Sequence, residues 1–278
     1  MRKNLFFAIA FIGLWPLTFA QNFKGKEIKL SIEPSPYKLT PGETLTYSAE
    51  WLGFPAGKII LSVKGIEQVS GHECYHVYAW ARPNNFFRMF YDVEYKVDSY
   101  IDTKTFSTLR FEKIRRKNQV FDYSMIQFDR EKNEATYSSC HPQGPIDKIN
   151  FASLSKDLAA NNPKTVKTAS LTQDPLSSVY YFRLLDIKEN NVYSINISFD
   201  QKDWPVKVKV GKLLLKEIRK KGIFSVFEFS AEAGMLNFVG GTGKSMVYFT
   251  TDSKRIPLSF ATNTKFGPIK GLIQDLPK

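Results

Sequence analysis

Short segments that alternate apolar and polar residues, separated by turn residues, recur along almost the whole chain. In the segment 58–67, for example, Ile59, Leu61 and Val63 occupy every second position, which is typical of a strand with one buried face. The predicted strands are Thr44–Trp51, Lys58–Glu67, Cys74–Ala81, Glu94–Ile101, Leu109–Arg116, Val120–Asp129, Glu134–Ser139, Val192–Asp200, Val206–Lys212, Leu214–Lys220, Ile223–Ala231, Lys244–Thr251, Pro257–Asn263 and Ile269–Leu276. This pattern predicts a mainly β fold, an antiparallel meander that curls into an open or closed β-barrel-like sheet.

Helical signals are few. Asp174 and Pro175 suit the N-cap and the first position of a helix, and Leu176, Val179, Tyr180, Arg183 and Leu184 follow at helical spacing. The apolar residues 84–90 interrupt the strand pattern and predict a short helical turn. Residues 141–167 hold three prolines and many small or polar residues, so we expect a loop or linker there.

The N-terminus has the pattern of a secretory signal peptide. Arg2 and Lys3 precede an apolar run, Pro16 breaks it, and Thr18 and Ala20 are small residues at the two positions that a signal peptidase reads. The alternative is a membrane anchor, but the run is short of the roughly 20 residues that a spanning helix needs. We expect cleavage after Ala20 and export to the periplasm or cell envelope.

The mature chain is then 21–278, which we predict to be a single β-rich domain, with a sub-division near 141–168 as the alternative. No later stretch is long and apolar enough to span a membrane. Export argues against nucleotide-driven chemistry, because ATP and NAD are not steadily supplied outside the cytoplasm. The net charge is +12, and a basic exported surface suits anionic lipid head groups or acidic glycans more than nucleic acid; a basic surface that serves solubility alone is the alternative.

The chain has two cysteines, Cys74 and Cys140. In an oxidising compartment they could form one disulfide, and the alternative is two buried free thiols.

Several spaced motifs resemble domain-of-unknown-function family 3108. They are Gly42-Glu43-Thr44-Leu45-Thr46-Tyr47, Trp51-Leu52-Gly53-Phe54-Pro55-Ala56-Gly57, Cys74-Tyr75-His76, Asn85-Phe86-Phe87 with Phe90-Tyr91, Asp98-Ser99-Tyr100-Ile101-Asp102, Leu109-Arg110-Phe111-Glu112-Lys113, Asp174-Pro175-Leu176, Phe249-Thr250-Thr251-Asp252 and Arg255-Ile256-Pro257. The resemblance covers essentially the whole mature chain. It implies an exported bacterial envelope protein and carries no activity or catalytic residues. The expected shape is also similar to that of half-barrel lipoprotein carriers, which is an analogy of fold alone.

The segment Gly240-Gly241-Thr242-Gly243-Lys244-Ser245 ends like a phosphate-binding loop. That motif needs a glycine where this chain has Phe238, and it must run into a helix, whereas Lys244–Thr251 has the pattern of a strand. We therefore expect a hairpin turn here and no nucleotide as cofactor or partner.

Catalytic and metal-binding patterns are weak. His72, Cys74 and His76 would share one strand face, and Cys140 or His141 could complete a zinc site. The spacing, however, matches no common zinc motif. Ordinary strand histidines beside a buried cysteine are the simpler interpretation, and we assign no metal. No Gly-x-Ser-x-Gly elbow or paired carboxylates stand out. We assign no catalytic residue and no cofactor.

Aromatic and basic residues are the better candidates for a binding site. The ligand-binding candidates are Trp51, Phe54, Phe86, Phe87, Phe90, Arg115 and Arg116. Core packing is the simpler explanation of such aromatics, and a solvated turn is the simpler explanation of the basic run at 113–117. The functional hypothesis is a non-enzymatic envelope protein that binds a lipid, glycolipid or other anionic envelope component. The alternatives are a structural or protein-interaction component of envelope biogenesis and, as a weaker one, a hydrolase.

Overall fold

A computed structural model describes residues 26–29, 37–141, 163–218, 221–231, 244–264 and 267–276. The predicted signal peptide, most of the predicted linker at 141–168 and the turn at 240–243 lie outside the described residues. No helix among the residues described is long and apolar enough to cross a membrane.

The described chain consists of strands and two short helices. The first half holds β1 (Lys26–Lys29), β2 (Thr44–Trp51), β3 (Phe54–Val69), β4 (His72–Pro83), α1 (Asn85–Arg88), β5 (Val93–Asp102), β6 (Thr108–Lys117), β7 (Val120–Asp129), β8 (Glu134–Cys140) and β9 (Lys164–Lys167). The second half holds α3 (Ser177–Leu184), β10 (Asn191–Phe199), β11 (Lys202–Ile218), β12 (Gly222–Ala231), β13 (Ser245–Thr250), β14 (Pro257–Thr264) and β15 (Gly267–Asp275). The mainly β prediction is confirmed.

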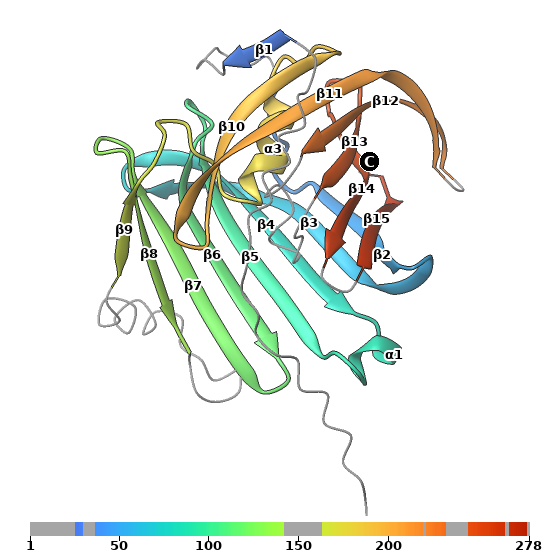
Figure 1. Cartoon of the computed structure of the whole chain (residues 1–278), viewed down its shortest axis with the longest axis horizontal. Coiled ribbons are helices and arrows are strands. Elements are labelled where there is room, and N and C mark those ends of the chain that lie inside the picture. The colour runs from blue at the N-terminus through green and yellow to red at the C-terminus, as the bar shows by residue number, and fades with distance from the viewer. Residues whose placement is uncertain are drawn as a thin grey trace, which may run out of the picture.

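All of these strands belong to one 15-stranded sheet with the order β1-β10-β11-β12-β13-β14-β15-β2-β3-β4-β5-β6-β7-β8-β9. Two antiparallel meanders, β2–β9 and β10–β15, join where β15 pairs with β2; the pairing of β1 with β10 is parallel. The sheet curls strongly (Figure 1), yet its edges β1 and β9 are not paired with each other. The open form of the predicted barrel is therefore the observed one.

Helix α3 lies on the concave side of the curled sheet (Figure 1). All eight of its residues are buried, and the Phe182 ring contacts those of Tyr181, Tyr193 and Phe229. Each large apolar side chain buried in this way contributes about 1.5–3 kcal/mol to stability. The helix is therefore the central part of the hydrophobic core, since strands of both meanders pack around it.

Buried polar contacts fix the start of α3. The helix begins at Ser177 with Leu176 at its N-cap position, so the predicted start at Pro175 is two residues early. The Asp174 carboxylate caps the turn that precedes the helix, because it accepts hydrogen bonds from the backbone N–H groups of Leu176 (2.7 Å) and Ser177 (2.9 Å). The same carboxylate accepts from the hydroxyls of Ser99 on β5 and Thr108 on β6. Complete burial raises the pKa of Asp174, and these donors oppose that shift. The cap thus ties the helix to the sheet.

A buried ion pair fixes the other end of α3. The Arg183 guanidinium donates to both carboxylate oxygens of Glu43, at 2.6 and 2.7 Å, and also to the carbonyl of Lys254 at 3.0 Å. Burial acts against the charged guanidinium, but the pairing with Glu43 outweighs it and raises the pKa of Arg183.

Three strand predictions need correction. The range Val206–Lys212 and the described part of Leu214–Lys220 belong to a single strand, β11, whose pairing with β12 shifts register between Val210 and Leu213. The bulge explains why the alternation changes phase there. Strand β9 lies within the predicted loop 141–167, and β1 was not predicted. Both are four-residue edge strands with little apolar pattern.

Cys74 and Cys140 are both buried, and neither takes part in a disulfide. Cys74 lies on β4 and Cys140 on β8, and β5, β6 and β7 separate these strands. Four strand spacings of about 4.8 Å each exceed the reach of a disulfide. The disulfide, which the sequence left open, is therefore not formed, and the alternative of two buried thiols describes this structure. Burial, with the charge of Asp102, raises the pKa of Cys74 to about 12.

Candidate functional site

Helix α1 is a single turn that connects β4 to β5 at one end of the sheet (Figure 1). The side-chain oxygen of Asn84 caps it by accepting from the N–H of Phe87 at 3.0 Å. The Asn84 amide also donates to the carbonyl of Pro55 at 2.7 Å, and its backbone N–H donates to Ala56 at 2.8 Å. One asparagine thus caps α1 and ties it to the start of β3.

The side chains around α1 are apolar and exposed. Leu52 and Phe54, in the β2–β3 turn, are 59% and 68% exposed. Phe86, Met89 and Phe90, on and after α1, are 60%, 72% and 75% exposed. Single exposed apolar residues are ordinary, but a group of this kind marks an interaction surface. We call these five residues, together with Trp51, Phe87 and Tyr91, the α1 tip.

Ring contacts hold the aromatic side chains of the α1 tip together. Phe87 meets Trp51 edge-on at 5.7 Å between ring centroids, and Phe86 contacts Phe87 at 5.3 Å and Phe90 at 5.6 Å. Trp51 is also the pairing partner of Phe54. The five aromatic residues predicted from the sequence as ligand-binding candidates therefore form one group.

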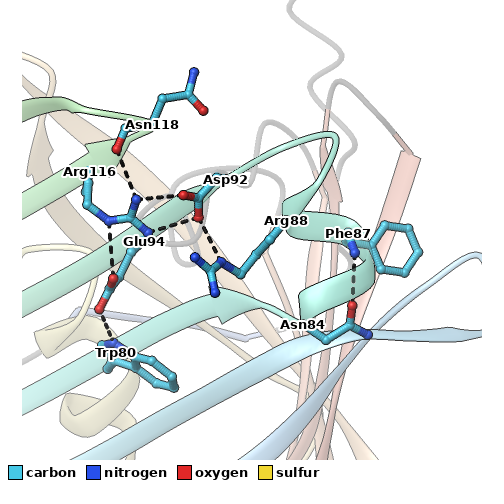
Figure 2. A network of polar contacts seen from close by, with 8 residues as sticks. All are labelled: Trp80, Asn84, Phe87, Arg88, Asp92, Glu94, Arg116 and Asn118. Carbon is cyan, nitrogen blue, oxygen red and sulfur yellow. Dashed lines mark hydrogen bonds and ion pairs between the residues drawn. The ribbon is translucent and has the colours of Figure 1, made fainter.

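A polar network braces α1 against the sheet (Figure 2). Both terminal nitrogens of Arg116 donate to Asp92, at 2.8 and 2.9 Å, and Arg88 donates to the same carboxylate at 3.0 Å. These two guanidinium groups hold the pKa of Asp92 well below its usual range. Arg116 also contacts Glu94, which accepts from the indole N–H of Trp80 at 2.7 Å.

Glu94 is a carboxylate among cations. Burial would raise its pKa, but the hydrogen bond from Trp80 and the charges of Lys96, Arg82 and Arg116 together lower it. Lys58 lies directly opposite Arg82 in the β3–β4 ladder, and Lys117 places its ammonium 5.7 Å from the centre of the Tyr91 ring. We call Lys58, Arg82, Arg88, Lys96, Arg116 and Lys117 the basic collar.

The basic collar carries six positive charges around the two negative charges of Asp92 and Glu94. On the neighbouring strand pair, Glu50 lies opposite Lys270, and their charges cancel. The surface next to the α1 tip is therefore positively charged.

The two arginines predicted as ligand-binding candidates lie on opposite faces of β6, since they are consecutive in a strand. Arg116 belongs to the basic collar. Arg115 lies on the same face as the core residue Phe111 and pairs with Asp122. Burial and the nearby Tyr91 raise the pKa of Tyr95 to about 12, and the charge of Arg115 opposes that shift. Arg115 therefore adjoins Tyr91 from the concave side, and Lys117, at the end of β6, shares that face of the strand. Arg115 is left out of the collar because its charge is paired with Asp122.

Several parts of this site were not predicted. Leu52 and Met89 lie between the predicted aromatics, and their position in connections between strands is a signal that could have found them. The acids Asp92 and Glu94 and the collar residues Lys58 and Arg82 carry no local signal, because cross-strand register brings them together.

The histidines pair with carboxylates instead of with cysteine. His72 contacts Asp102 at 2.9 Å, His141 contacts Asp122 at 2.7 Å, and His76 lies between Glu67 at 2.6 Å and Asp98 at 2.7 Å. Across the ranges that the structure describes, no three His, Cys, Asp or Glu residues are placed to hold a metal ion. Ser245 begins strand β13, so the Gly-Lys-Ser sequence runs into a strand and lacks the helix of a phosphate-binding loop.

Comparison with known proteins gives a family and a fold. A search of curated proteins finds no match. Among solved structures, the crystal structure of a β-barrel-like protein of domain of unknown function DUF1849 from Brucella abortus matches with a TM-score of 0.50 and 10% identity, covering 84% of this chain and 96% of that one. At this identity the likeness concerns the fold alone. The family model "Protein of unknown function (DUF3108)" matches residues 46–274. The chain therefore belongs to the DUF3108 family.

Proposed function

We propose that this is an exported, non-enzymatic protein of the cell envelope that binds an amphiphile, a lipid or glycolipid, through the α1 tip. The observation that carries the proposal is the exposure of Leu52, Phe54, Phe86, Met89 and Phe90 in one group. Exposed apolar surface is unfavourable in water, and contact with acyl chains removes it from water. The positive charge of the basic collar suits an anionic or zwitterionic head group.

The tip is a better candidate than the interior of the sheet. In barrels that carry lipids inside, the ligand needs an apolar cavity. Here α3 occupies the concave side, and its residues Tyr180, Phe182 and Leu184 are at most 1% exposed. We therefore place the amphiphile outside the curled sheet.

Support for a non-enzymatic role comes from two buried charged groups on and beside α3, which have structural partners. Asp174 accepts four hydrogen bonds that hold α3, and Arg183 pairs with Glu43. Support for export is the signal-peptide pattern of residues 1–20.

A structural or protein-interaction role in envelope biogenesis is the second candidate. The observation that favours it is the burial of α3 on the concave side, since a scaffold needs no cavity there. It differs from the first proposal in its expectation that the exposed tip contacts a protein and has no measurable affinity for lipid.

Equilibrium binding of a single-chain lysophospholipid, kept below its micelle concentration, tests the proposal. Two double variants are compared. The tip variant carries Phe86→Ser and Phe90→Ser. The control, called the ribbon variant, carries Leu215→Ser and Ile223→Ser on β11 and β12, where the two side chains are 70% and 68% exposed. We expect the parent protein and the ribbon variant to bind alike, and the tip variant to bind about tenfold more weakly for each phenylalanine. Absence of binding to the parent protein, or equal binding by the tip variant, contradicts the proposal.

A further inference from the structure

The shape of the α1 tip narrows the class of amphiphile that it can bind. Side chains that line a pocket for one lipid molecule are largely covered by their neighbours. Met89 and Phe90 instead keep 72% and 75% of their surface, and Phe54, on the adjoining turn, keeps 68%. These side chains project from the end of the molecule. A projecting apolar surface can contact a single acyl chain, and it can also insert among the many chains of an extended lipid surface.

Two connections build this projection side by side. The β2–β3 turn contributes Leu52 and Phe54, and α1 with the residues after it contributes Phe86, Met89 and Phe90. The hydrogen bonds of Asn84 to Pro55 and Ala56 tie the two connections together. The Arg88–Asp92–Arg116 contacts tie α1 to β6 (Figure 2). The projection is therefore ordered before it meets a partner, which reduces the entropy lost on binding.

Charge adds a second, independent observation. Lys58 and Arg82 lie opposite each other on β3 and β4, a pairing of like charges that costs stability. Lys58 and Lys117 are exposed. Lysine and arginine next to an apolar projection can extend their charged ends to phosphate groups while their methylene chains lie along apolar surface. Each such residue near an anionic lipid surface strengthens binding by about fivefold.

We infer that the protein docks peripherally on an anionic lipid bilayer, with the α1 tip inserted between head groups and the basic collar on the lipid phosphates. This inference rests on the proposed function and names the bilayer surface as the form in which the amphiphile is bound. Aromatic and aliphatic side chains beside cationic ones are the composition of interfacial membrane anchors. Helix α1 is a single turn that positions these side chains, and it is too short to bind an anion at its own N-terminus.

Co-sedimentation with vesicles tests the inference. Vesicles of phosphatidylcholine mixed with phosphatidylglycerol are compared with vesicles of phosphatidylcholine alone, at low and at high salt. We expect binding to the anionic vesicles, weaker binding to the neutral ones, and loss of the difference at high salt, because the screening length falls to about 3 Å at 1 M salt.

Two variant pairs locate the contact. Phe86→Ser with Phe90→Ser is expected to weaken vesicle binding by about tenfold per side chain, and Leu215→Ser with Ile223→Ser to leave it unchanged. Lys58→Glu with Lys117→Glu is expected to weaken binding to anionic vesicles by about tenfold or more, and the reversal of two distant exposed lysines, Lys207→Glu with Lys212→Glu, to weaken it less. Thermal unfolding of each variant shows that the fold is kept.

The outcomes separate the inference from the proposed function. If the parent protein binds the lysophospholipid through its tip but does not sediment with anionic vesicles, the bilayer inference fails and amphiphile binding stands. If it binds neither, both fail, and the tip is assigned to a protein partner. Equal binding to neutral and anionic vesicles, or loss of binding in the ribbon variant and not in the tip variant, also overturns the inference.

Discussion

Glu43 and Arg183 lie beside α3 with side chains that are 4% and 3% exposed. Removal of one partner leaves the other charge buried without compensation, which costs about 3–5 kcal/mol. We therefore predict that Arg183→Met lowers the free energy of unfolding by that amount, and that Glu43→Gln added to Arg183→Met costs much less than the sum of the two single changes. Urea unfolding of the four proteins measures the coupling. A loss below about 1 kcal/mol for Arg183→Met, as for a surface pair, contradicts the prediction.

His76 gives stability a dependence on pH. Burial lowers its pKa, but the hydrogen bonds to Asp98 and Glu67 outweigh burial, and the net shift is upward. A pKa raised by folding means that the protonated imidazole stabilises the fold. This contribution is fully present below the unfolded value of about 6.5 and is lost as pH rises through the folded value.

The corresponding test is a series of thermal melts from acidic to mildly alkaline pH. We predict that His76→Gln removes part of the loss of stability on passing through neutral pH, and that it destabilises the protein more at acidic than at alkaline pH. His141→Gln is the control, because His141 is 72% exposed. An unchanged pH profile in His76→Gln contradicts the assignment.

At the residue scale, the sequence predicted which side chains form the candidate site better than it predicted their partners. Trp51, Phe86, Phe87 and Phe90 could be found because aromatic residues in connections are unusual. The partners of Arg116 could not be found, because Asp92 and Glu94 reach it through the register of two strands. The pairing of Cys74 with Cys140 was open for the same reason, since sequence separation says nothing about the number of strands between them.

At the element scale, α1 depends on its cap. We predict that Asn84→Ala costs about 1 kcal/mol of stability and allows the turn to fray, since it removes the bonds to Phe87 and Pro55. Amide hydrogen exchange at Phe87 and Tyr91 should then become faster, and amphiphile binding weaker. Asn85→Ala is the matched control, because the structure gives its exposed side chain no capping bond. Equal exchange rates in the two variants would show that the cap does not order the tip.

Strand predictions succeeded where the alternation of apolar residues is long and regular. They failed for β1 and β9, whose four residues are stabilised by pairing with distant parts of the chain. They divided β11 in two because its bulge shifts the alternation at Gly211. Helix α3 was predicted from the Asp-Pro start and the helical spacing, and all eight of its residues are buried against the curled sheet.

At the scale of the whole molecule, composition and periodicity predicted a curled antiparallel sheet, and the structure is one (Figure 1). They left open whether it closes and what fills it. The two edges stay unpaired with each other, and α3 is buried on the concave side. We place the proposed binding function on the outer surface, at the end that carries α1, where apolar exposure and positive charge meet.

Spin labels placed on this surface test the central claim most directly. Cys74 and Cys140 are buried, so a cysteine in place of Phe90 or, as the control, of Ile223 can be labelled selectively. On anionic vesicles we predict that the label at position 90 becomes accessible to oxygen and shielded from a water-soluble nickel complex, and that the label at position 223 stays exposed to nickel. A label at position 90 that remains as open to nickel as the one at position 223 would contradict the account.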